Sequence, residues 1–151
     1  MPQSLDRELL FMLHDVGRLI RTKADQRART YGMTRAQWVI LSRLERQPGL
    51  SQNEMAAIVE VEPITIARLV DRLESAGFVE RRPDPKDRRI WRLHLTPAAQ
   101  PILAEIKKHK AQLHDEITAG VEPATLDLMV EGLLKLKANL ASDGRTSLAA
   151  V

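Results

Sequence analysis

The sequence has no cysteine, few aromatic residues and no long apolar run, and each absence excludes a class of protein. Without cysteine there are no disulfides, thiolate metal ligands or cysteine-based redox sensors. Phe, Trp and Tyr make up 3% of the residues, so the core must consist mainly of Leu, Ile, Val and Ala. No apolar run approaches the roughly 18 residues of a membrane span. Residues 1–8 lack the apolar region of a secretory signal, and we therefore expect a cytoplasmic protein.

Side chains suited to metal binding or catalysis are also sparse. The four histidines are scattered, and none of them has the spacing of a metal site. The sequence contains neither a glycine-rich phosphate loop nor a serine nucleophile in a recognisable turn. We therefore expect no enzymatic activity and no cofactor.

The apolar residues recur mainly at helical spacing. With 44% hydrophobic residues in a chain of 151, one domain with a real core is expected. The spacing predicts helices over about 5–30, 34–46, 51–59, 62–76, 97–119 and 123–141. Two short extended runs, 78–82 and 90–95, flank a turn rich in Pro, Asp and Arg, which predicts a β-hairpin. The expected fold is mostly α with one small hairpin, in the order α-α-α-α-β-β-α-α.

Several helix boundaries have local signals. Ser4 is the expected N-cap of the first helix, and Ser51 with Glu54 has the spacing of a capping box. Thr96 is expected to cap a helix that has Pro97 at its first position. The tail from Ser142 onward is expected to be frayed.

Basic residues are concentrated in the hairpin. Residues 81–92 contain two acids, Asp84 and Asp87, and six cations: Arg81, Arg82, Lys86, Arg88, Arg89 and Arg92. The segment therefore carries +4, whereas the whole chain carries +3, so the remainder sums to −1. A projecting basic element suits contact with a polyanion, although a solvated hairpin with ordinary surface arginines is an open alternative.

The two helices before the hairpin have the pattern of a helix-turn-helix. The second of them points Thr65 and Arg68 outward from its N-terminal half, and an arginine can bind guanine bidentately in the major groove. Arg68 could instead pair with Asp71 within the helix. Together with the basic hairpin, the pair predicts a winged helix-turn-helix whose wing inserts an arginine into the minor groove.

Four blocks of this sequence resemble the MarR family of bacterial regulators, and within it the SlyA branch. They are Gly32–Leu41, Leu50–Ala56, Leu69–Gly77 and the segment from Asp87–Arg89 to Leu95–Pro97. The resemblance implies a homodimer with a winged helix-turn-helix in residues 31–96 and a helical dimerisation domain in residues 1–30 and 97–151. It implies DNA contacts at Thr65, Arg68 and Arg89, with Arg88 and Lys86 beside the latter and Asp87 bracing the turn.

The same resemblance implies control by a small aromatic or phenolic acid, or by an acyl-CoA thioester. The positions that match the family's ligand crevice are Leu10, Leu13, His14, Gly17, Arg18 and Trp38. Other roles remain open: Trp38 as a core residue, His14 as a partly buried histidine, and Arg18 as the partner of Asp15, Asp25 or a second chain. We expect a ligand-responsive repressor that binds a pseudo-palindromic operator. The alternative is a constitutive DNA-binding protein or a helical protein-interaction module without a ligand.

Overall fold

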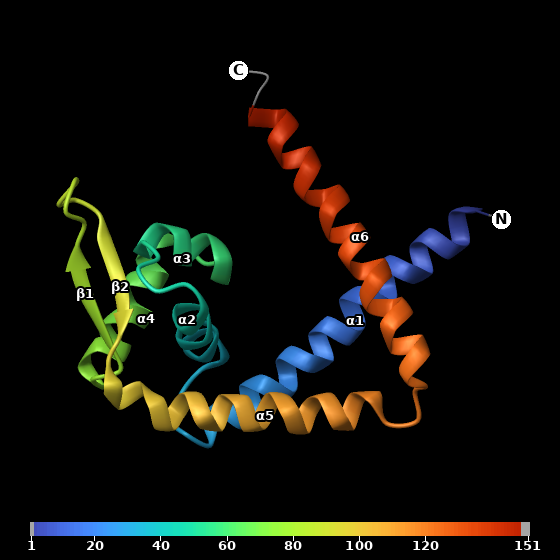
Figure 1. Cartoon of the computed structure of the whole chain (residues 1–151), viewed down its shortest axis with the longest axis horizontal. Coiled ribbons are helices and arrows are strands. Elements are labelled where there is room, and N and C mark those ends of the chain that lie inside the picture. The colour runs from blue at the N-terminus through green and yellow to red at the C-terminus, as the bar shows by residue number, and fades with distance from the viewer. Residues whose placement is uncertain (1, 149–151) are drawn as a thin grey trace. The chain divides into compact units, whose positions relative to one another are not determined.

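The chain folds in the expected element order. The computed structural model describes the backbone of residues 2–148 and the side chains of residues 8–142. The elements are α1 (Pro2–Arg29), α2 (Arg35–Arg46), α3 (Gln52–Val59), α4 (Pro63–Ser75), β1 (Val79–Pro83), β2 (Trp91–Leu95), the 3₁₀ turn η1 (Pro97–Ala99), α5 (Gln100–Thr118) and α6 (Pro123–Leu148) (Figure 1). Residues 1–110 and 111–151 form two separate compact units. The predicted mostly helical fold with a small hairpin is confirmed.

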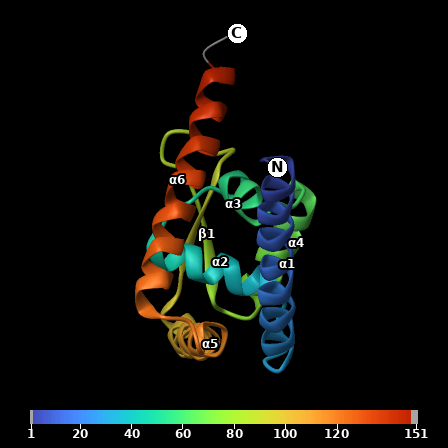
Figure 2. The same ribbon diagram turned by 90° about the vertical axis from the view of Figure 1, so that its right-hand side faces the viewer.

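The first unit contains the helix-turn-helix and the hairpin. Strands β1 and β2 pair antiparallel from Val79 opposite Leu95 to Pro83 opposite Trp91. Helix α4 packs against α3 and β1, and α2 contacts α3, α4 and β2 (Figures 1 and 2). This arrangement brings the hairpin beside both helices of the helix-turn-helix.

Side chains cap two helices in this unit. Ser51 Oγ accepts from the Glu54 N–H at 3.0 Å, and Glu54 Oε2 accepts from the Ser51 N–H at 3.1 Å. The capping box predicted for α3 is thus confirmed. Thr34 and Gln37 form a second capping box at the start of α2. Both boxes satisfy backbone N–H groups that the first helical turn leaves without a carbonyl partner.

One apolar core unites the elements of the first unit. The apolar spacing predicts inner faces on α2 and α4, and both are buried: Trp38, Leu41 and Leu44 on α2, and Ile66, Leu69, Val70 and Leu73 on α4. Met55 of α3, Leu93 of β2 and Leu103 of α5 contribute side chains that are at most 1% exposed. Since such buried aliphatic groups each stabilise a fold by about 1.5–3 kcal/mol, this core fixes α4 relative to the hairpin.

The corner between α3 and α4 has an unusual backbone. Glu60 adopts a left-handed conformation, with φ 60° and ψ 46°, and its N–H bonds the carbonyls of Ala56 and Ala57. Pro63 then occupies the first turn of α4, where its missing N–H has no intrahelical partner to lose. The corner therefore ends one helix and begins the next within three residues.

Two predictions of helix ends were wrong, and a third is confirmed only in part. Helix α1 begins at Pro2, so Ser4 lies inside the helix rather than at its cap. Helix α6 runs to Leu148 and passes through Gly144, because one glycine costs only about 1 kcal/mol in a helix interior. Thr96 occupies the expected N-cap position with Pro97 next, but it precedes the 3₁₀ turn η1 rather than α5 directly. Its hydroxyl makes no cap bond and donates to the Gly77 carbonyl instead.

The spacing of apolar residues predicts a buried face of Ile102, Ile106, Leu113 and Ile117 on α5, and the structure differs from this prediction. Leu103, which the sequence did not single out, is buried together with Ile106, whereas Ile117 is 50% exposed. The prediction assumed one buried stripe along the helix. The residues of α5 that belong to the core lie in its N-terminal part, whereas Leu113 is half-buried and Ile117 is exposed in the single chain.

Helices α1 and α6 each expose apolar side chains. On α1 these are Leu9, Leu10, Phe11, Met12, Leu13, Val16 and Leu19, and on α6 they are Leu128, Met129, Val130, Leu133, Leu134 and Leu140. In the part of the chain that the structure describes, neither helix is long and apolar enough to cross a membrane.

Candidate nucleic-acid interface

Thr65 and Arg68 lie on the exposed side of α4. The two side chains are three residues apart on one helical face, and the intervening Ile66 faces the core. Asp71, the alternative partner of Arg68, instead accepts from Arg81 Nη2 at 2.7 Å. Arg68 is therefore accessible to a ligand, as a DNA-reading side chain must be.

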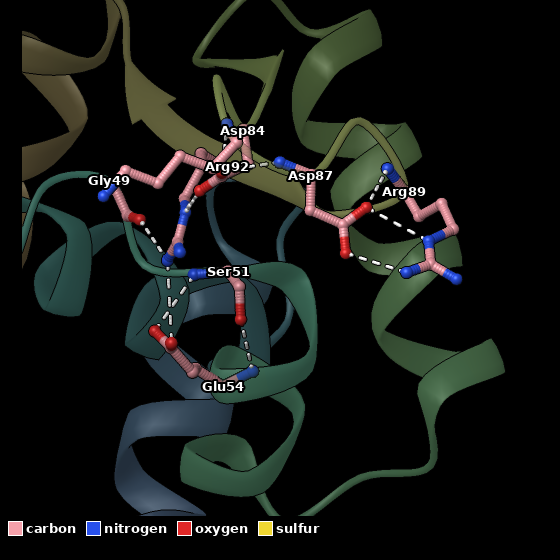
Figure 3. Close-up of polar contacts among 8 residues, drawn as sticks. Gly49, Ser51, Glu54, Asp84, Asp87, Arg89 and Arg92 are labelled. Atoms are coloured by element: carbon pink, nitrogen blue, oxygen red, sulfur yellow. Dashed lines mark hydrogen bonds and ion pairs between the residues drawn. The ribbon is translucent and has the colours of Figure 1, made fainter.

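Asp84 organises the turn between the strands. Its Oδ1 accepts from the N–H groups of Lys86 and Asp87 at 2.8 and 3.1 Å, and its Oδ2 accepts from Arg92 Nε at 2.9 Å (Figure 3). The Lys86 N–H and then the Arg92 side chain lower the pKa of Asp84 below its ordinary value. The Asp84 N–H also donates to the Ile90 carbonyl. The turn therefore depends on an ionised Asp84.

Asp87 holds Arg89 at the tip of the hairpin. Its Oδ1 accepts from the Arg89 backbone N–H and from Nε, each at 3.1 Å, and its Oδ2 accepts from Nη2 at 3.2 Å. Bonding to the Arg89 side chain is the largest cause of the lowered pKa of Asp87. The Arg89 side chain is still 90% exposed. Lys86 and Arg88, on either side of Asp87, are exposed as well.

The six hairpin cations are not equivalent in their surroundings. Arg81 and Arg92 have side chains that are 15% and 32% exposed and bind carboxylates of the protein. Arg82 pairs with Glu80. The exposed cations at the turn are therefore Lys86, Arg88 and Arg89, and the other three serve contacts within the fold.

Arg92 fastens the hairpin to the start of α3. Besides Asp84, its guanidinium contacts the Gly49 carbonyl at 3.3 Å and Glu54 Oε1 at 3.6 Å (Figure 3). Glu54 thus belongs both to the capping box of α3 and to the support of the turn. The sequence did not single out this role of Arg92, because its partners Gly49 and Glu54 lie about forty positions earlier.

The residues expected to bind a small ligand are only partly brought together. Leu10, Leu13, His14 and Arg18 are exposed on α1, and Gly17 is half-buried there. The Arg18 guanidinium binds the Asp15 carboxylate at 3.0 Å, one of the partners considered from the sequence.

Trp38 lies in the core. It is 4% exposed, and its ring packs 5.9 Å from that of Tyr31 and 5.6 Å from that of His109, between centroids. Among the described residues, its indole Nε1 is buried without a hydrogen-bond partner. These two aromatic neighbours come from the turn that follows α1 and from α5.

The fold and sequence match known regulators. The sequence profile of the MarR family matches residues 33–91. The crystal structure of MarR is 30% identical, with a TM-score of 0.80, over 92% of this chain and 94% of that one. The transcriptional regulator PA3341 is 33% identical, with a TM-score of 0.78, over 89% of this chain and 98% of that one. The protein belongs to the MarR family.

Membership of the MarR family makes this protein a DNA-binding transcriptional regulator rather than an enzyme. It also implies operator DNA and dimerisation. The structure of the regulator SlyA has a TM-score of 0.76 at 22% identity, over 89% of this chain and 95% of that one. At that identity the likeness concerns the fold alone, so it does not separate a SlyA branch from the rest of the MarR family.

Proposed function

We propose that this MarR family protein is a homodimeric repressor that binds a pseudo-palindromic operator through the winged helix-turn-helix of residues 31–96. Thr65 and Arg68 would read bases in the major groove. Arg89 would enter the minor groove, with Arg88 and Lys86 near the backbone and Asp87 as the brace. The observation that carries this assignment is Arg89, which is 90% exposed at the turn and held by both oxygens of Asp87.

We place dimerisation in residues 1–30 and 97–151. The exposed apolar side chains of α1 and α6 support this assignment, because contiguous apolar surface of this kind marks an interaction site. Ala28, Leu103 and Ile106 are nevertheless buried in the same core as α2 and α4. The proposed domains therefore share part of their packing, and α1 and α5 would transmit changes between them.

We also propose release from DNA by a small aromatic or phenolic acid, or by its CoA thioester, as in the SlyA-like branch to which the sequence blocks point. Arg18 is an exposed cation among apolar side chains of α1, and a carboxylate could replace Asp15 as its partner. Leu10, Leu13, His14 and Gly17 would line the site. Trp38 could contribute only the small part of its ring that the core leaves accessible.

Ligand release would follow from thermodynamic linkage. A ligand that prefers a spacing of the two DNA-binding lobes incompatible with adjacent major grooves must weaken DNA binding by the same factor by which DNA weakens ligand binding. A constitutive regulator, or a helical interaction module, would show no such linkage. Because operator DNA is its partner, the protein is proposed to act in the cytoplasm.

Footprinting combined with light scattering tests the central assignment. Two-fold symmetry predicts two protected half-sites about 10 bp apart, centre to centre, and a dimer at micromolar concentration. A monomer in solution, or one unrepeated half-site, would contradict the proposal.

A further inference from the structure

Arg81 joins three elements of the DNA-binding unit. From β1 its Nη2 donates to Asp71 Oδ1 at 2.7 Å and to the Ala67 carbonyl at 3.0 Å, both on α4. Nη1 donates to Glu74 Oε1 at 3.2 Å, and Nε donates to Gln52 Oε1 of α3 at 3.0 Å. Every nitrogen of the guanidinium is therefore engaged, and the strand is bonded to both helices of the helix-turn-helix.

The geometry requires an arginine. The Arg81 backbone N–H also donates to Glu74 Oε2 at 3.1 Å, so both oxygens of that carboxylate are bound by one residue. A planar fork of five N–H donors can bind four acceptors on two helices at once, whereas the compact ammonium of lysine, with three donors, cannot. With its side chain only 15% exposed, Arg81 is shielded from solvent far better than Arg89.

The position of these contacts ties them to the proposed DNA contacts. Ala67 and Asp71 flank Arg68 along α4, so Arg81 is bonded to the same stretch of helix that presents the proposed base-reading arginine. On the hairpin, Arg81 lies opposite Leu93, two residues from the end of the pairing, beyond which the turn carries Arg89. Arg81 thus connects the segment of α4 that carries Arg68 to the hairpin that carries Arg89.

We propose that Arg81 is a positioning residue that fixes the wing relative to the recognition helix, so that the major-groove and minor-groove contacts form together. This inference rests on the proposed DNA contacts at Arg68 and Arg89. With the wing fixed, Arg89 reaches the minor groove without a further loss of conformational freedom. If the wing is mobile, the conformational entropy lost on ordering the hairpin offsets much of the binding free energy that the Arg89 contact contributes.

The loss of operator affinity caused by Arg89→Ala, compared with and without Arg81, therefore tests whether Arg81 positions the wing. We expect Arg81→Gln to weaken operator binding and to reduce the loss of affinity caused by Arg89→Ala by about tenfold, within the coupling range of residues in one network. The loss caused by Arg68→Ala should change less. Reduced stability alone would lower binding in every background but would leave the ratio for Arg89→Ala unchanged.

Arg82→Gln is the matched control. It changes the neighbouring arginine, whose side chain is 57% exposed and pairs with Glu80 on the same strand. In this background Arg89→Ala should have the same effect as in the native protein. If Arg81→Gln fails to fold, Asp71→Asn with Glu74→Gln removes the charged partners on α4 instead, and the effect of Arg89→Ala should again shrink.

Trp91 provides a readout that is independent of DNA. Its side chain is 44% exposed and lines a cavity of about 430 Å³ together with Gln52, Glu74 and Arg81. The other tryptophan, Trp38, is in the core, so Trp38→Phe leaves a single reporter on the wing. Adding Arg81→Gln should shift the Trp91 emission to the red and lower its anisotropy, whereas Arg82→Gln should change neither.

Two results separate the possible failures. If Arg89→Ala weakens binding equally with and without Arg81, or if the Trp91 signal does not change, the positioning role is overturned. If neither Arg68→Ala nor Arg89→Ala weakens binding in the native background, the DNA contacts are wrongly assigned. The proposed role of Arg81 in DNA binding is then also wrong. The Trp91 emission and anisotropy then show only whether Arg81 restrains the hairpin.

Discussion

The guanidinium of Arg89 lies against the carboxylate of Asp87, with Nε to Oδ1 at 3.1 Å and Nη2 to Oδ2 at 3.2 Å (Figure 3). An exposed ion pair of this kind adds only about 0–1 kcal/mol to stability. Its effect is to restrict the rotamers of the arginine before DNA arrives. The side chain proposed to enter the minor groove is thus already oriented by its neighbour.

Asp87→Asn tests that orientation. Removing an acid near DNA should tighten binding if only net charge matters. If bracing dominates, binding should weaken about two- to tenfold, because one mobile side chain must be ordered on binding at about 0.5–1.5 kcal/mol. Fluorescence anisotropy with a labelled operator at fixed salt measures the difference. Tighter binding by the variant would show that Asp87 does not act as a brace.

Arg89→Ala should weaken binding by a similar factor on operator and on unrelated duplexes. The slope of log K against log salt should fall by about 0.9 for each phosphate that the variant no longer neutralises. Titrations at several salt concentrations measure the slope. Arg29→Ala, which removes an exposed arginine at the end of α1 rather than in the hairpin, controls for the loss of one positive charge. An unchanged slope would mean that Arg89 does not displace counterions from DNA.

Arg68→Ala should act differently, because a base-reading arginine contributes at particular base pairs. We expect a loss of about 1–3 kcal/mol on the best operator and a smaller loss on sequences altered at the contacted pair. Selection of bound sequences from a randomised pool compares the preferences. A preference profile identical to that of the native protein would remove Arg68 from the set of base contacts.

The turn should lose stability in acid. Because the folded-state pKa of Asp84 is lowered from the ordinary 3.8, its contribution is present above that value and is lost as the pH falls through the folded-state pKa. Amide exchange of Lys86 and Asp87 should therefore speed up in that window. Asp84→Asn should show fast exchange of the same amides already at neutral pH; slow exchange in the variant would show that other bonds hold the turn.

Arg18→Ala should abolish release by an anionic aromatic ligand while leaving operator affinity within about twofold, since surface changes remote from an interface have small effects. A thermal-shift screen of aromatic acids, phenols and acyl-CoA thioesters identifies the ligand, because binding to the native state raises apparent stability. If the variant no longer dimerises or binds DNA, Arg18 has a structural role and the ligand site lies elsewhere.

Local patterns predicted much of the DNA-binding unit. The buried face of α4 follows from four aliphatic residues at helical spacing, and the Ser51–Glu54 box follows from two residues three apart. Both depend on contacts within one or two helical turns, which sequence spacing determines directly. The strand positions were predicted because turn residues separate two short extended runs.

The support of the wing could not be predicted in the same way. Arg81 bonds residues 7, 10 and 29 positions away, and only the pairing register determines that it faces α4. From composition alone, Arg81 is one of six hairpin cations that could contact DNA. The misjudged face of α5 has a similar origin, since the spacing of apolar residues does not indicate where the neighbouring core ends.

The left-handed conformation of Glu60 affects how this helix-turn-helix can be recognised from sequence. Corners between helices of this kind often contain glycine, which adopts positive φ without strain. Here a glutamate makes the corner, and residues 51–76 contain no glycine at all. A sequence search that required glycine at this corner would miss the helix-turn-helix. The Ser51–Glu54 capping box before the corner and Pro63 after it identify the motif better.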